Sequence, residues 1–128
     1  NLIFCLEPNP ECYGSNFMVN STETAQVVKN VNHPNIKMQL DTGSIIINNA
    51  DPYYICSNFK DIIGHIHISE PFLKEVKASH DIHKHCSNAI SEFLPDLPKT
   101  IEMLPKQNSK NLSYIENSIK NVISCYSK

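Results

Sequence analysis

The stretch Ile63-Gly64-His65-Ile66-His67-Ile68 decides the fold, because apolar and polar residues alternate along most of it. A β-strand places successive side chains on opposite faces. Ile66 and Ile68 would therefore share one face, and His65 and His67 the other. This pattern predicts a strand with one buried apolar face and one polar face that carries two histidines.

Three other short stretches, at residues 2–7, 36–41 and 99–103, repeat this alternation. Each has a carboxylate at or near its end, and in each the carboxylate falls on the face opposite the main apolar residues. Together with the imidazole of the strand at 63–68, the chain has four polar groups in matching positions: Glu7, Asp41, His67 and Glu102.

Helices are predicted between and after these strands, at about residues 21–31, 51–62, 79–94 and 109–126. Apolar residues recur at spacings of three and four in the last two, and Asn20 or Ser21 can cap the first. The order is therefore βα four times within one domain, residues 1–128. Such alternation predicts an α/β fold with parallel strands, right-handed crossovers and outer helices.

In folds of this kind, binding residues gather at the carboxyl ends of the strands. We therefore expect Glu7, Asp41, His67 and Glu102 to form one metal site. Three carboxylates and one imidazole suit Mn²⁺ or Mg²⁺, and Co²⁺ is also compatible. For any single carboxylate a solvated residue or a helix cap is the alternative, but four at matching positions favour the metal site.

Composition excludes several function classes. With 128 residues, 41% of them hydrophobic, the chain can bury a core, and a formal charge of −2 gives no basic footprint for nucleic acid or an anionic membrane. No stretch approaches the roughly 20 apolar residues of a membrane span. Five scattered cysteines, an odd number without a close pair, indicate reduced thiols and hence a cytoplasmic protein.

The four motifs, taken in order, resemble the last four strands of the sugar isomerase/epimerase family with a xylose-isomerase-like TIM barrel. The motifs are Leu6-Glu7-Pro8-Asn9-Pro10, Gln39-Leu40-Asp41-Thr42-Gly43, Gly64-His65-Ile66-His67-Ile68-Ser69-Glu70 and Ile101-Glu102-Met103. The resemblance covers nearly the whole chain.

The resemblance implies the (βα)4 carboxyl-terminal half of a barrel with one divalent cation on Glu7, Asp41, His67 and Glu102. It also implies an isomerase or epimerase that moves a proton next to a sugar carbonyl through an enediolate. Glu7 and Glu102 would be its base and acid.

A complete βα barrel takes about 250 residues, so four units cannot close one alone. We expect either a missing amino-terminal half in a longer protein or a second copy that faces the first. The start at Asn1, directly before a strand and without an initiator Met, favours the first alternative.

The sequence departs from the epimerases at three positions near the substrate. Ser44 stands where they carry His, Leu73 where they carry Arg, and Tyr13 where they carry Glu. The predicted metal ligands are retained while these sugar contacts are not. Either the substrate differs or activity has been lost.

Other polar residues receive supporting roles. Asn9 is expected to orient Glu7, and His65 to be a hydrogen-bonded interior residue one layer below His67, with Gln39 and Thr100 in the same layer. Glu70 is either a substrate contact or a loop charge. Three further histidines are expected in a solvated helix start: His80, His83 and His85.

Three function classes remain open. A metal-dependent sugar isomerase or epimerase is the first hypothesis, and a non-catalytic barrel fragment or binding module is the alternative. An endonuclease IV-like phosphodiesterase is less favoured, because it needs extra His ligands and a basic DNA face. Ser44 and the acidic balance of the chain oppose it.

Overall fold

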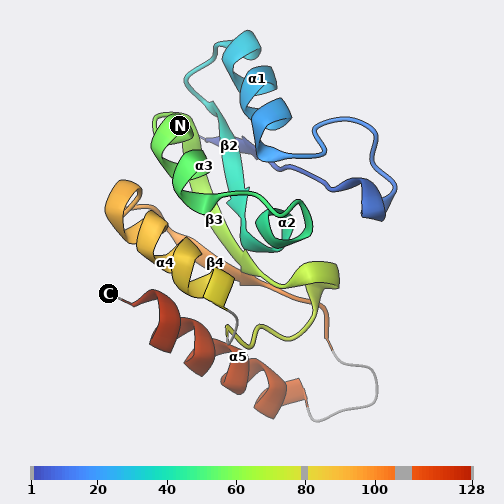
Figure 1. Ribbon diagram of the computed structural model, residues 1–128, viewed down its shortest axis with the longest axis vertical. Coiled ribbons are helices and arrows are strands. Elements are labelled where there is room, and N and C mark those ends of the chain that lie inside the picture. The colour runs from blue at the N-terminus through green and yellow to red at the C-terminus, as the bar shows by residue number, and fades with distance from the viewer. Residues whose placement is uncertain (1, 79–80, 106–110, 128) are drawn as a thin grey trace.

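The structure, a computed structural model, describes residues 2–78, 81–105 and 111–127. Its centre is a four-stranded parallel sheet with the strands side by side in chain order (Figure 1). The strands are β1 (Phe4–Leu6), β2 (Ile36–Asp41), β3 (Ile63–Ser69) and β4 (Lys99–Glu102). This confirms the predicted α/β class and parallel strands, although β1 begins two residues later than expected.

Four long helices lie in a row along one side of the sheet (Figure 1). They are α1 (Ser21–Val31), α3 (Pro52–Phe59), α4 (Asp81–Phe93) and α5 (Asn111–Tyr126). All four were predicted. The expected starts of the last two helices, at residues 79–80 and 109–110, lie outside the described residues.

Three short elements were not predicted: the helix α2 (Thr42–Ile47) and the 3₁₀ turns η1 (Glu11–Tyr13) and η2 (Pro71–Leu73). α2 begins directly after β2, and the Asp41 side chain caps it by accepting a hydrogen bond from the Ser44 backbone N–H. An Asp followed by a helical turn is an N-cap signature. Asp41 therefore lies at a strand end, as expected for a metal ligand, and it also caps a helix, which was the alternative role considered for a single carboxylate.

The core lies between the sheet and the helices. Met38 and Leu40 of β2 and Ile66 and Ile68 of β3 are fully buried, which confirms the predicted apolar face. Further buried residues come from the helices: Val28, Cys56, Cys86, Ala89 and Ile90. Full burial of a Leu or Ile side chain contributes about 1.5–3 kcal/mol, so this layer fixes which face of each strand turns away from the core.

Both edges of the sheet are open among the described residues. β1 pairs only with β2, and β4 pairs only with β3. Apolar side chains are exposed near both edges of the sheet. They are Leu2, Ile3 and Phe4 at β1, and Leu112, Ile115, Ile119 and Ile123 on α5, the helix that follows β4. Unpaired strand edges and apolar surface of this kind are the usual sites of association.

No helix in the described part of the chain is both long and apolar enough to cross a lipid bilayer. None of the five cysteines is joined to another in a disulfide. Cys56 and Cys86 are buried, and Cys12 is exposed.

Candidate metal centre

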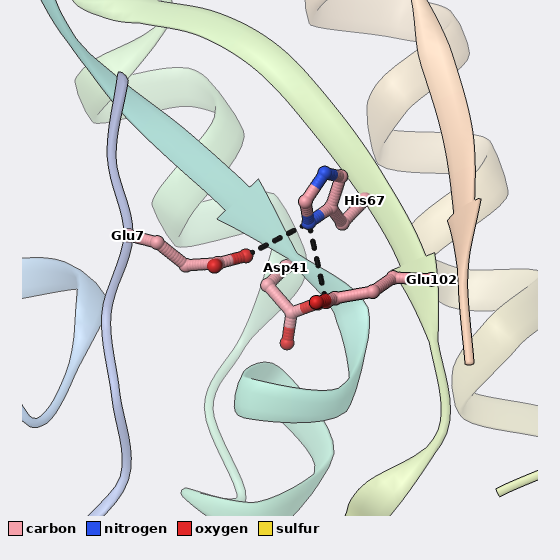
Figure 2. A group of neighbouring side chains, drawn as sticks. All are labelled: Glu7, Asp41, His67 and Glu102. Atoms are coloured by element: carbon pink, nitrogen blue, oxygen red, sulfur yellow. Dashed lines mark hydrogen bonds and ion pairs between the residues drawn. The ribbon is translucent and has the colours of Figure 1, made fainter. Parts of the chain in front are cut away.

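Four side chains converge where the carboxyl ends of the strands meet (Figure 2). Glu7 directly follows β1, Asp41 ends β2, His67 lies in β3 and Glu102 ends β4. One potential ligand atom from each residue lies within 4.8 Å of the corresponding atoms of the other three. Because β2 and β3 pair Asp41 with His67, the backbone register itself brings two of the four together.

His67 is at the centre of the group. Its Nδ1 lies 2.9 Å from Oε1 of Glu7 and 3.2 Å from Oε2 of Glu102. Figure 2 shows the two glutamates reaching toward this nitrogen from opposite sides, one from the β1 end and one from the β4 end. About a third of each glutamate side chain is exposed, at 37% and 38%, so the group remains open to a ligand.

Asp41 is the most enclosed member of the group. Its Oδ1 accepts a hydrogen bond from the Ser44 backbone N–H, and its Oδ2 accepts one from the Ser69 hydroxyl, both at 2.5 Å. Burial raises the pKa of Asp41, and the two hydrogen bonds oppose this rise. The carboxylate is thus held in one orientation beside His67.

Burial also raises the pKa of Glu7, and the nearby carboxylates of Asp41 and Glu102 raise it further while His67 opposes the shift. Like charges held this close repel, and a cation between them would relieve the repulsion. Three carboxylates and one imidazole within 4.8 Å form a donor set that fits a divalent cation. The group could therefore hold one metal ion.

His65 lies on the same face of β3 as His67. Its Nε2 is 2.8 Å from the hydroxyl of Thr100, and its ring meets the His67 ring edge to face at 5.4 Å. Burial lowers the pKa of His65, and His67 lowers it further. Gln39 pairs with His65 across the β2–β3 register, as the predicted layer requires, whereas the β3–β4 register pairs Thr100 with His67. Thr100 reaches His65 only through the hydrogen bond of its hydroxyl.

Glu70 does not act as a solvated loop charge, because it is only 7% exposed. Its Oε1 lies 3.2 Å from Nε2 of His83 and accepts a hydrogen bond from the Lys77 backbone N–H. Glu70 also lines the cavity beside the four-residue group.

The expectation that His83 lies in a solvated helix start is wrong. The side chain is fully buried, and its Nδ1 lies 2.7 Å from the Tyr126 hydroxyl. His83 shares the apolar face of α4 with Cys86 and Ile90, at spacings of three and four, and that spacing was the available signal. His85 is exposed as expected, and His80 lies outside the described residues.

A cavity of about 570 Å³ opens beside the four-residue group. Asn9 lines it next to Glu7 and is itself exposed. Tyr13 and Phe72 form part of its wall: their rings meet edge to face at 5.6 Å, and the Tyr13 hydroxyl accepts a hydrogen bond from the Phe72 backbone N–H. Sequence reasoning missed this pairing because two loops 59 residues apart create it.

Neither protein-family models nor curated proteins match this sequence. Solved structures do. A D-psicose 3-epimerase crystallised with D-fructose has a TM-score of 0.78 at 14% identity, covering 98% of this chain and 50% of that one. An L-ribulose 3-epimerase has a TM-score of 0.82 at 14% identity, covering 98% and 47%. The probable 3-DHS dehydratase AsbF from Bacillus anthracis has a TM-score of 0.60 at 17% identity, covering 95% and 49%.

This chain has the fold of half a TIM barrel. The half-barrel spans about half the length of the solved structures it matches. At these identities the likeness establishes the fold, and it confirms the fold that the four sequence motifs implied. The carboxyl ends of barrel strands are where active sites of this fold lie, and the half-barrel places Glu7, Asp41, His67 and Glu102 there.

Proposed function

We propose that the half-barrel carries the metal-binding half of a sugar isomerase or epimerase. One observation supports this above all: four consecutive strands each bring one ligand-type side chain to a common point, within 4.8 Å, on the fold of two sugar 3-epimerases. The cluster takes one member from the end of each strand or close to it, and it combines three carboxylates with an imidazole.

The proposed ligands are Glu7, Asp41, His67 and Glu102, and the proposed ion is Mn²⁺ or Mg²⁺, with Co²⁺ as a substitute. When bound, such an ion supplies Lewis-acid polarisation of a sugar carbonyl and its neighbouring hydroxyl. Asp41 is already fixed by two hydrogen bonds, so it would need little rearrangement to serve as a ligand.

Glu7 and Glu102 are the proposed base and acid. They approach His67 from the two edge strands, Glu7 from β1 and Glu102 from β4 (Figure 2). A substrate held between them would therefore present opposite faces to the two carboxylates. One would take the proton from the carbon next to the carbonyl, leaving an enediolate. The other would return a proton to the opposite face, which inverts that carbon in an epimerase.

A second set of four βα units is the proposed structural partner, either the amino-terminal half of the barrel or a second copy of this chain. The open edges of β1 and β4, with the exposed apolar residues beside them, support this proposal. Closing the sheet would pair both edges and would wall in the polar face that carries His65 and His67. We call the half-barrel together with this partner the complete protein.

Calorimetric titration of the complete protein with Mn²⁺, together with turnover of D-psicose, D-fructose, D-tagatose and L-ribulose, tests the function. We expect about one Mn²⁺ per half-barrel and epimerisation of at least one ketose. Glu102→Gln should abolish turnover, whereas Glu92→Gln, which changes an exposed carboxylate on α4, should not. Absence of Mn²⁺ binding, or unchanged turnover in Glu102→Gln, would sink the proposal.

A non-catalytic binding module is the second candidate function. One feature of the cavity lining favours it. Phe72 and Leu73 bring apolar side chains to the cavity lining, where hydrogen-bonding groups for a polyhydroxylated sugar would be useful. Metal binding without turnover of any ketose in the panel would support this candidate. The described cavity lining includes no Lys or Arg, which weakens the case for a phosphodiesterase acting on nucleic acid.

A further inference from the structure

Ser69 makes the shortest side-chain contact to the proposed metal ligand Asp41. The Ser69 hydroxyl donates to Asp41 Oδ2 at 2.5 Å and accepts a hydrogen bond from the Gly43 backbone N–H at 2.9 Å. The Gly43 N–H can only donate and an ionised carboxylate can only accept, so the single proton of the Ser69 hydroxyl points to Asp41. Ser69 is 1% exposed, and solvent cannot replace it as the donor.

Gly43 provides the space for this hydroxyl. A Cβ at position 43 would lie 2.6 Å from the Ser69 Oγ and 3.1 Å from the Glu70 carbonyl oxygen. The first distance is too short for any side chain to occupy without moving the hydroxyl. Glycine at position 43 and serine at position 69 therefore depend on each other.

Thr42 joins the same two strand ends. Its Oγ1 donates to the Ser69 carbonyl oxygen and accepts from the Ser69 backbone N–H, both at 2.8 Å. β2 and β3 pair Asp41 with His67, two residues before Ser69. The contacts of Thr42, Gly43 and Ser69 consequently fix the end of β2 against the end of β3, and with it the position of Asp41 relative to His67.

We propose that Ser69 is a positioning residue, which holds the Asp41 carboxylate in the orientation that binds the divalent cation, and that Gly43 is required for it to do so. This inference rests on the proposed metal site. The Ser44 N–H fixes one carboxylate oxygen and the Ser69 hydroxyl fixes the other, so the plane of the carboxylate cannot rotate. Partners of this kind typically contribute 10- to 100-fold to metal affinity.

Mn²⁺ titration of the complete protein, by calorimetry and by electron paramagnetic resonance of the free ion, tests the inference. Ser69→Ala should raise the Kd for Mn²⁺ roughly 10- to 100-fold. Ser87→Ala is the matched control, because Ser87 is also 1% exposed and its hydroxyl donates to the Cys125 carbonyl oxygen at 2.6 Å, in the contact between α4 and α5. Both variants should lose thermal stability, but only Ser69→Ala should lose Mn²⁺ affinity.

Gly43→Ala is a second variant that tests the role of the Ser69 hydroxyl in Mn²⁺ binding. It serves as the test if Ser69→Ala fails to fold. The added Cβ should displace the hydroxyl and weaken Mn²⁺ binding while Ser69 itself is retained. Wild-type Mn²⁺ affinity in a folded Ser69→Ala or Gly43→Ala variant would overturn the inference alone, and so would an equal loss in Ser87→Ala. Absence of Mn²⁺ binding in the wild-type protein would overturn the proposed function as well.

Discussion

Glu70 Oε1 and His83 Nε2 lie 3.2 Å apart, and this contact joins the residue after β3 to the first turns of α4 beneath the surface. The other ring nitrogen of His83 lies 2.7 Å from the Tyr126 hydroxyl near the end of α5. One buried imidazole thus connects three segments that are distant in the sequence. A side chain in this position is expected to contribute to stability.

His83→Ala should lower the free energy of unfolding by about 3–5 kcal/mol, because it removes one partner of a buried carboxylate and of a buried hydroxyl and leaves a cavity. His85→Ala is the matched control on the same helix. His85 is exposed, so its change should stay within about 0.5 kcal/mol. Urea unfolding of the complete protein measures both. Equal stability of the two variants would contradict the structural role of His83.

The amino-terminal cap of α1 offers a smaller and independent test. Asn20 Oδ1 accepts a hydrogen bond from the Glu23 backbone N–H at 2.9 Å, and Glu23 in return accepts one from the Val19 N–H. Asn20→Ala should cost about 1 kcal/mol, whereas Asn20→Asp, which keeps an acceptor at the same place, should cost little. Thermal unfolding compares them. A loss in Asn20→Asp as large as that in Asn20→Ala would count against the cap.

Local patterns in the sequence were sufficient to predict the strand β3 and the start of the helix α1. The alternation of Ile66 and Ile68 with His65 and His67 reports which face is buried, because a strand has a period of two. The Asn20 cap is equally local, since its partner is three residues away. The helical spacing of His83 with Cys86 and Ile90 signals its burial locally, but its hydrogen-bond partner Tyr126 lies 43 residues later, and no neighbouring residue signals that contact.

The candidate site likewise has a part that local sequence patterns predict and a part that depends on contacts between distant segments. Glu7, Asp41, His67 and Glu102 could be grouped from strand parity, since each stands near a strand end. The Ser69 contact to Asp41 could not, because it requires the register between β2 and β3 and the missing side chain of Gly43. The wall made by Tyr13 and Phe72 depends on loops, and Phe72 adopts a left-handed φ of 61° that its residue type does not suggest.

The burial of two cysteine thiols leads us to expect that the folded protein loses stability at alkaline pH. Burial raises the pKa of Cys56 and of Cys86 to about 12, from an ordinary value of 9.0. Between these values the folded chain retains protons that the unfolded chain releases, so the stability linked to both thiols is complete below about pH 9 and is lost as the pH rises toward 12. Urea unfolding at pH 8 and at pH 10.5 should show this decrease.

The same burial predicts the order of thiol modification. Iodoacetamide at pH 8 should modify the exposed Cys12 first, and it should reach Cys56 and Cys86 only after unfolding. Mass spectrometry of the digested protein assigns each site. Modification of Cys86 in the folded protein as fast as that of Cys12 would show that the core between the sheet and α4 is open.

Metal-linked stability is the most direct solution test of the four-residue group. An ion that binds the folded but not the unfolded chain at 100 times its Kd stabilises the protein by about 2.7 kcal/mol. Mn²⁺ should therefore raise the melting temperature of the complete protein, and EDTA should reverse the rise. His67→Gln should remove the effect, because His67 lies between both glutamates, at 2.9 and 3.2 Å. His85→Gln, at an exposed site on α4, should retain it, and a Mn²⁺ response that persists in His67→Gln would place the ion elsewhere.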